Sequence, residues 1–212
     1  RIGYGRALFE QSGIHVRATV SDISAPVVLS DEAGPVACYG IPYLAPDAVM
    51  AQLEAERSHA SVLDAAMQRV RADAAARGID RIVVAAHAFV VGQSASAESD
   101  SERDISVGGV PHVPVSVFDG ADYVALGHLH RPQSVGASHI RYSGSPLAFG
   151  FDESDCVKSM SLVEIDAAGR STVETIPFEP VHRVRALRGK HAELLLAEPS
   201  EDLIKVVLTD DA

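Results

Sequence analysis

The spacing of apolar residues divides the first part of the chain into a strand-rich segment and a helical one. In residues 13–43, short runs rich in β-branched residues alternate with turn residues. These runs predict strands at residues 14–16, 26–29 and 36–39. In residues 47–78, apolar residues recur every four positions and stop at Gly78, which is typical of an amphipathic helix with a glycine cap. Ser58 interrupts this pattern, so we expect a break or a new helix start there.

Two continuous apolar runs have the length of buried strands, and both lead directly into histidine-containing segments. Residues 81–86 precede His87, and residues 123–126 precede residues 127–133. A strand that is apolar at nearly every position is typical of the centre of a parallel sheet, so we expect residues 81–86 to be covered on both faces. The polar residues 93–104 predict a loop whose length is typical of functional loops.

The second half of the chain predicts further strands and then a change of composition. The predicted strands cover residues 139–142, 159–165 and 172–176. A turn at residues 166–169 joins the last two as a hairpin, and we expect these strands to build a second sheet. After Pro180 the chain becomes basic and then predicts a short helix and a strand at residues 204–208, which we interpret as the start of another module.

Composition bounds the class of protein. The 212 residues are 47% hydrophobic and 22% charged, which is typical of globular proteins and excludes disordered and collagen-like classes. No apolar run approaches the roughly 20 residues of a membrane span, and no signal-peptide or lipidation pattern is found, so we expect a cytoplasmic protein without a membrane partner. Two cysteines, Cys38 and Cys156, favour a reduced compartment over a disulfide framework.

The acidic balance restricts nucleic-acid binding without excluding a nuclease. Eighteen basic residues against 29 acidic ones give a net charge of −11, which argues against DNA binding by diffuse phosphate attraction alone. An enzyme that holds phosphodiesters through divalent cations carries its positive charge in the metal. The sequence contains no asparagine, so an Asn side chain is excluded as a metal ligand within this chain.

Three histidines follow the apolar strands, at positions where open α/β sheets place their ligand crevices. His87 and His128 each come at the carboxyl end of a predicted strand, and His130 follows two residues later. Neutral imidazole nitrogen binds Mn, Fe and Zn well, so these three residues are candidate metal ligands. A histidine taken singly is more often a packing or surface residue, and six others without a partner motif are interpreted in that way. Those six are His15, His59, His112, His139, His182 and His191.

A longer string around these histidines resembles a known motif. Residues 122–133, together with Tyr-Ser-Gly-Ser-Pro at residues 142–146, are similar to the last metal motif of the calcineurin-like metallophosphoesterases, and within them to the SbcD-like family of double-strand-break repair nucleases. The segment around His87 resembles the histidine motif that precedes it in that family. The further matching segments are residues 41–44, 83–92, 101–103, 107–109 and 188–189. The resemblance therefore runs from about Ile41 to the end of the chain.

The resemblance implies a phosphodiesterase site with two metal ions, usually Mn²⁺, with Mg²⁺ as the alternative. It places His87 and His128 at positions that bind one ion and His130 at the position that binds the other. Two such ions can activate water and stabilise the charge of an in-line phosphoryl displacement. It also implies DNA as the substrate and a homodimer that works in a heterotetramer with an SbcC-like ATPase.

Four residues near the last motif are weaker candidates for contacts with DNA phosphate. They are Arg131, Tyr142, Ser143 and Ser145. The Ser-Gly-Ser-Pro string is equally typical of a turn, and an arginine beside proline is often merely solvated. In the polar loop, we interpret Glu102 and Arg103 as a surface ion pair rather than as site residues.

The chain departs from the family in its missing motifs. Family members carry Asp-x-His, Gly-Asp and Gly-Asn-His motifs, and none of these occurs in the sequence. Half of the implied ligands are therefore absent, and we expect the general-acid histidine that would protonate the leaving group to lie upstream of Arg1. By this resemblance Arg1 begins just after the third motif. We expect the chain to be the second half of a catalytic domain, without a catalytic general acid of its own and inactive in isolation.

The sequence thus predicts an α/β fold, namely the C-terminal portion of a metallophosphoesterase-type sandwich of two mixed β-sheets flanked by helices. Residues 1–180 are assigned to the phosphoesterase domain and residues 181–212 to the beginning of a DNA-binding capping domain. Two alternatives stay open. A calcineurin-like phosphatase or cyclic-nucleotide phosphodiesterase shares the Gly-His-x-His motif, and a non-catalytic folding or assembly fragment would explain the absent ligands.

Overall fold

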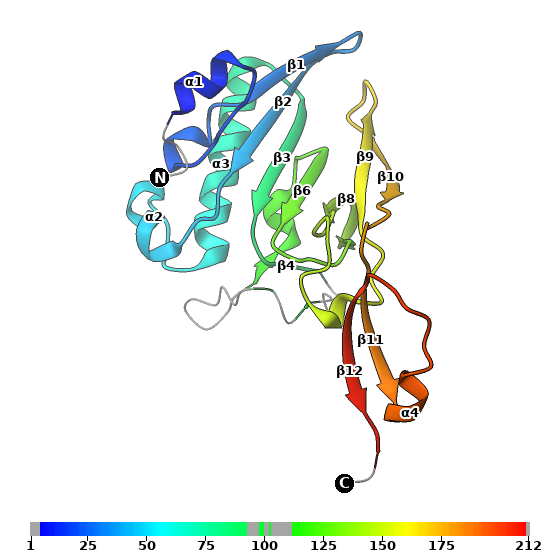
Figure 1. Ribbon diagram of the computed structural model, residues 1–212. Coiled ribbons are helices and arrows are strands. Elements are labelled where there is room, and N and C mark those ends of the chain that lie inside the picture. Colours follow the sequence, from blue (N-terminus) through cyan, green and yellow to red (C-terminus); the bar gives the residue numbers. More distant parts are fainter. Residues whose placement is uncertain (1–4, 93–97, 100–101, 103–111, 211–212) are drawn as a thin grey trace.

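The computed structural model describes residues 5–92, 98–99, 102 and 112–210, and it shows a mixed α/β fold (Figure 1). Its largest unit is a six-stranded sheet in the order β1-β2-β3-β6-β8-β7. These strands are β1 (Val27–Asp31), β2 (Gly34–Ile41), β3 (Arg81–His87), β6 (Tyr123–Gly127), β7 (Gln133–Val135) and β8 (Ala137–Tyr142). The four central strands run parallel, and β1 and β7 are antiparallel edges. The predicted α/β class, a mixed sheet flanked by helices, is confirmed.

Helices and smaller strands surround this sheet. The helices are α1 (Arg6–Gln11), α2 (Pro46–Leu53), α3 (His59–Arg77) and α4 (His191–Leu194), with 3₁₀ turns η1 (Val20–Asp22), η2 (Val115–Phe118) and η3 (Phe151–Glu153). The other strands are β4 (Val90–Val91), β5 (Val113–Pro114), β9 (Ser159–Ile165), β10 (Ser171–Pro177), β11 (Val184–Gly189) and β12 (Leu203–Leu208). Within the described ranges, no helix has the length and apolar character needed to cross a membrane.

Helix α3 forms the core together with one face of the sheet (Figure 1). Its residues at the predicted four-residue spacing are all buried, namely Val62, Ala66, Val70 and Ala74. The side chain of Ser58 caps the helix by accepting a hydrogen bond from the N–H of Ser61, and Gly78 ends it with a φ of 67°. The apolar stripe and both predicted boundaries are confirmed.

The opposite face of the sheet is partly open in the described part of the chain. Ala85 of β3 is exposed, and small residues such as Gly40 and Gly127 line a hollow of about 400 Å³ beside it. The predicted cover on both faces of β3 is therefore wrong for these residues. The helices that pack on the sheet core lie on the α3 side, and small side chains on the other face cannot fill the space themselves.

The strand predicted at residues 14–16 is also wrong. Arg17 lies directly over β2, because a Cβ placed on Gly40 would be only 2.9 Å from the Cβ of Arg17. The segment therefore crosses the sheet face instead of pairing with a strand. Ile14, in the same segment, is 54% exposed.

The second sheet forms only in part. β8 joins the large sheet beside β6, whereas β9 and β10 pair as a separate antiparallel hairpin. Beyond this hairpin, β11 and β12 form a parallel pair with α4 between them in the chain, and every side chain of β12 is exposed. Figure 1 shows this last unit at the opposite end of the molecule from α1.

Candidate metal centre

Two of the predicted ligands, His87 and His128, lie side by side at the carboxyl ends of neighbouring strands. Strands β3 and β6 are parallel, and His87 is in register with Gly127, the residue before His128. The centroids of the two imidazole rings are 5.5 Å apart, and the ring planes meet at 71°. A Cβ on Gly127 would lie 3.4 Å from Nδ1 of His87, so the glycine leaves room for this ring.

The backbone of His128 adopts a conformation that favours glycine. Its φ is 132°, a value that side-chain-bearing residues rarely adopt. Such a conformation costs on the order of 1–3 kcal/mol, and residues that carry this cost cluster at active and ligand-binding sites. At this bend the ring of His128 also lies 5.8 Å from the ring of Phe89.

The surroundings of both rings favour the neutral imidazole. Partial removal of water lowers the pKa of His87, and the same effect, reinforced by the neighbouring His87 and His130, lowers the pKa of His128 to about 4. At neutral pH both residues therefore carry an unprotonated ring nitrogen. This is the form in which histidine coordinates metal ions.

The imidazole of His130 has partners of its own. Its Nδ1 lies 3.1 Å from Oε1 of the buried Glu153, and its ring lies 5.5 Å from that of Phe149. Among the described residues, no group of three or more His, Cys, Asp and Glu side chains has the arrangement of a metal site. The structure thus places His87 against His128 and holds His130 in a separate network two residues further on.

The backbone of His130 is also fixed by hydrogen bonds of its N–H and its carbonyl oxygen. Its N–H donates a hydrogen bond to Glu102, and its carbonyl oxygen accepts from Nζ of Lys158 at 2.9 Å and from the N–H of Ser145 at 3.1 Å. The carboxylate of Glu102 therefore reaches the candidate site. The predicted partner, Arg103, lies outside the described residues, as do most of the polar loop and residues 107–109.

The start of the chain also lies outside the described residues. Arg1, upstream of which we expect the general-acid histidine, belongs to residues 1–4, and the description begins at residue 5. The expectation that Arg1 follows the third family motif therefore stays a prediction.

Tyr142 and Ser145 are internal. Tyr142 is fully buried, and its hydroxyl bonds with the backbone of Ala88 and Val90. Ser145 is 8% exposed, donates to the carbonyl oxygen of Leu147 and accepts from Lys158. Tyr142 is the last residue of β8, and the hydroxyls of both residues are engaged inside the protein.

Arg131 and Ser143 keep partly exposed side chains. The Arg131 guanidinium donates to the carbonyl oxygen of Asp152 and forms an ion pair of 3.0 Å with Asp155. The hydroxyl of Ser143 bonds with that of Ser161 at 3.1 Å. Each side chain thus has an internal partner and a surface that solvent reaches.

One of the six remaining histidines lies near the candidate site. His59, at the start of α3, is buried, and its ring centroid is 5.8 Å from that of Tyr43. Tyr43 in turn lies 6.0 Å from the ring of His87. His59 is therefore buried, as a packing role requires, and it packs against a ring that contacts His87.

Two residues of this region were not identified from the sequence. Glu153 and Lys158 occur in the run Phe-Asp-Glu-Ser-Asp-Cys-Val-Lys at residues 151–158, whose polar composition is typical of an exposed loop. Both are buried behind His130. The run has no hydrophobic periodicity that distinguishes Glu153 from its acidic neighbours, so their burial depends on contacts distant in sequence.

The chain is similar in sequence to a known nuclease subunit. No protein-family profile matches the chain. A curated relative, the SbcD subunit of the nuclease SbcCD from Staphylococcus saprophyticus subsp. saprophyticus, is 28% identical over 197 residues, which cover 92% of this chain and 50% of the relative. The chain therefore spans about half the length of the relative that it matches. The resemblance that the histidine motifs indicated is confirmed, and the chain is SbcD-like over nearly all of its own sequence.

Proposed function

We propose that the chain is the part of a manganese-dependent, SbcD-like nuclease domain that supplies the histidine ligands of a two-metal site. In this proposal His87 and His128 hold one ion and His130 holds the other. The observation that carries the proposal is the pair of adjacent, neutral imidazoles at parallel strand ends, with the backbone of His128 strained at φ 132°. Strained backbone conformations cluster at active and ligand-binding sites, which supports a functional role for His128 over a packing role.

The side chains present suit a divalent cation and supply part of its coordination shell. Neutral imidazole is a common ligand of first-row divalent ions. Oε2 of Glu102 is buried and has no hydrogen-bond partner within the described part of the chain, and a buried carboxylate oxygen in that situation costs free energy unless a cation or donor completes it. The sequence has no Asn, Asp-x-His or Gly-Asp, so the ligands that the family carries in those motifs are absent from these 212 residues.

The proposed chemistry is hydrolysis of phosphodiester bonds. When bound, two divalent ions activate water and stabilise the developing charge on the phosphate. His87, His128 and His130 would fix the positions of those ions, and the rigid strands β3 and β6 would fix the first two imidazoles. The group that protonates the leaving oxygen is proposed to lie outside this chain, which makes the 212 residues inactive alone.

The substrate and partners follow from the same proposal. We assign DNA as substrate, a cytoplasmic location, and a homodimer joined to an SbcC-like ATPase in a heterotetramer. Residues 1–180 would belong to the phosphoesterase domain and residues 181–212 to the start of the capping domain. Arg131 and Ser143, which keep partly exposed side chains, are the stronger of the four candidates for phosphate contacts.

The test uses a version of the protein extended to the length of its relative. We expect it to bind two Mn²⁺ ions by elemental analysis and to degrade duplex DNA ends faster than cyclic nucleotides. His87→Ala and His128→Ala should share one metal-binding defect, and His130→Ala should show another, because each ion retains its other ligands. His191→Ala, in the exposed helix α4, is the control that should keep both ions.

Three results would overturn the assignment. Full metal content and activity in His130→Ala would contradict the two-metal interpretation. Faster turnover of cyclic nucleotides would favour the phosphodiesterase alternative. Metal binding without turnover of either substrate would favour a folding or assembly module.

A further inference from the structure

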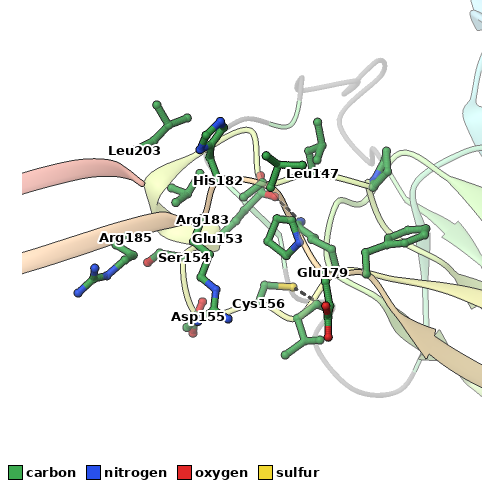
Figure 2. Close-up of a pocket in the computed structure, with 18 residues that line it drawn as sticks. Leu147, Glu153, Ser154, Asp155, Cys156, Glu179, His182, Arg183, Arg185 and Leu203 are labelled. Atoms are coloured by element: carbon green, nitrogen blue, oxygen red, sulfur yellow. Dashed lines mark hydrogen bonds and ion pairs between the residues drawn. The ribbon is translucent and has the colours of Figure 1, made fainter. Parts of the chain in front are cut away.

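A buried ion pair lies directly behind His130. The side chains of Glu153 and Lys158 are 0% and 7% exposed, and Nζ of Lys158 donates to Oε2 of Glu153. Figure 2 shows Glu153 at a pocket of about 770 Å³ that residues of η3 and β11 help to line. Burying two charges costs several kcal/mol per ion unless each is fully hydrogen-bonded, so a pair in this position requires an explanation.

The ammonium group of Lys158 is fully satisfied. Its three N–H donors reach Glu153, the carbonyl oxygen of His130 at 2.9 Å and the hydroxyl of Ser145 at 3.0 Å. Because an ammonium group only donates, it fixes Oε2 of Glu153 as an acceptor. The other carboxylate oxygen, Oε1, is thereby directed to the far side of the group.

Oε1 of Glu153 faces the imidazole of His130. It accepts from the hydroxyl of Ser99 at 2.9 Å and lies 3.1 Å from Nδ1 of His130. An ionised carboxylate has no proton to donate, so this contact is a hydrogen bond only when Nδ1 carries the proton. In the neutral imidazole, a proton on Nδ1 places the lone pair on Nε2.

We propose that Glu153 is a positioning residue that holds His130 in the Nδ1–H tautomer and directs the lone pair of Nε2 to a divalent cation, while Lys158 fixes the orientation of the Glu153 carboxylate. Metal-binding histidines are commonly oriented by a carboxylate on the ring nitrogen opposite the metal. The tautomer follows from the contacts of the chain itself. Only the last link, to the cation, rests on the proposed function.

The substitution Glu153→Gln distinguishes positioning from packing, because it preserves the volume of the side chain. Lys158 only donates, so it retains the amide oxygen, and the amide NH₂ then faces Nδ1 of His130. Nδ1 becomes an acceptor and the proton moves to Nε2. The positioning role therefore predicts an inverted tautomer, whereas a packing role predicts no change.

A second variant keeps the test decisive if the lone charge of Lys158 destabilises the fold. In Glu153→Gln combined with Lys158→Met, the ammonium group is absent and the amide can turn its oxygen to Nδ1. This double variant should recover the Nδ1–H tautomer. Glu174→Gln on β10 and Lys205→Met on β12 are exposed control substitutions that should leave the tautomer of His130 unchanged.

The measurement is a long-range ¹H–¹⁵N correlation spectrum of the histidine rings, recorded on the metal-free chain at a pH where they are neutral. We expect Nδ1–H for His130 in the wild type and both controls, Nε2–H in Glu153→Gln, and Nδ1–H again in the double variant. A wild-type Nε2–H tautomer, or the same tautomer in all variants, would overturn the positioning role.

Titration with Mn²⁺ tests the link to the cation separately. Glu153→Gln should weaken Mn²⁺ binding about 10- to 100-fold, the usual effect of removing such a partner, and the double variant should recover most of it. Unchanged Mn²⁺ affinity in Glu153→Gln would overturn the link between this tautomer and the metal. If the protein extended to the length of its relative shows the expected tautomers and binds no Mn²⁺, the proposed function is contradicted and the positioning of His130 is left in place.

Discussion

The hydroxyl of Tyr142 donates a hydrogen bond of 2.6 Å to the carbonyl oxygen of Ala88 and accepts one of 2.8 Å from the N–H of Val90. This buried side chain thereby ties the end of β8 to the segment that follows His87. Tyr142→Phe would remove both of these buried hydrogen bonds. We predict a loss of about 2–4 kcal/mol in the free energy of unfolding, measured by urea denaturation.

Tyr123→Phe is the matched control for this prediction. Tyr123 is also buried, on β6, and its hydroxyl has no hydrogen bond among the described residues. Its replacement should change the free energy of unfolding by less than about 0.5 kcal/mol. An equal decrease in the free energy of unfolding of the two variants would show that the Tyr142 hydrogen bonds between β8 and the segment after His87 do not stabilise the fold.

Gly144 permits the close approach of two loops at the candidate site. Its φ is 80°, and a Cβ there would lie 2.6 Å from the carbonyl oxygen of His130. Gly144→Ala therefore adds a backbone clash to the conformational cost, and we predict a loss of about 2–4 kcal/mol in unfolding free energy. Gly78→Ala, with a φ of 67° and nothing within 4 Å, isolates the conformational cost of about 1 kcal/mol. The same loss at both positions would show that the clash is relieved without cost.

The lowered pKa of His128 predicts a specific dependence of stability on pH. The pKa is about 4 in the folded chain against the ordinary 6.5. Between these values the unfolded chain binds a proton that the folded chain does not bind, so stability is full above the upper value and decreases as the pH falls towards the lower one. His128 should contribute a slope of up to about 1.4 kcal/mol per pH unit.

His128→Asn tests this slope, because asparagine tolerates positive φ better than most residues. Urea denaturation of the metal-free chain across this pH range should give a shallower decrease for the variant than for the wild type. Parallel curves for the two proteins would show that His128 titrates normally in the folded state.

Local patterns predicted the parts of the fold that local interactions determine. The α3 stripe, its caps and the apolar strands before His87 and His128 follow from spacing alone. The strand predicted at residues 14–16 does not form. Three extended residues carry no information about a partner strand, and Arg17 instead packs over Gly40.

The histidine positions of the candidate site could be predicted, but their supporting contacts could not. His87 and His128 follow from the meeting of parallel strand ends at one sheet edge. Glu153 and Lys158 lie 23 and 28 residues after His130 in an apparently exposed polar run, and tertiary contacts alone decide that they are buried. Tyr142 was interpreted as a candidate DNA contact, because the sequence does not show where a hydroxyl points.

The proposal predicts that the 212-residue chain alone does not degrade duplex DNA in the presence of Mn²⁺. Its three proposed histidine ligands are neutral, and the carboxylates of the Asp-x-His and Gly-Asp motifs are absent, so little negative charge would offset that of two divalent ions. A gel assay of labelled DNA ends with the purified chain checks this. Mn²⁺-dependent cleavage that persists on repurification and disappears in His128→Asn would show that the chain contains a complete site.

The central claim is that His87, His128 and His130 are metal ligands, and paramagnetic broadening by Mn²⁺ tests it most directly. In ¹H–¹⁵N spectra of the ¹⁵N-labelled protein extended to the length of its relative, low amounts of Mn²⁺ should broaden the imidazole signals of these three residues first, because broadening falls steeply with distance from the ion. The signals of His139 and His191, outside the candidate site, should persist at the same Mn²⁺ concentration. Uniform broadening of all histidines, or selective broadening of the two control residues, would contradict the assignment.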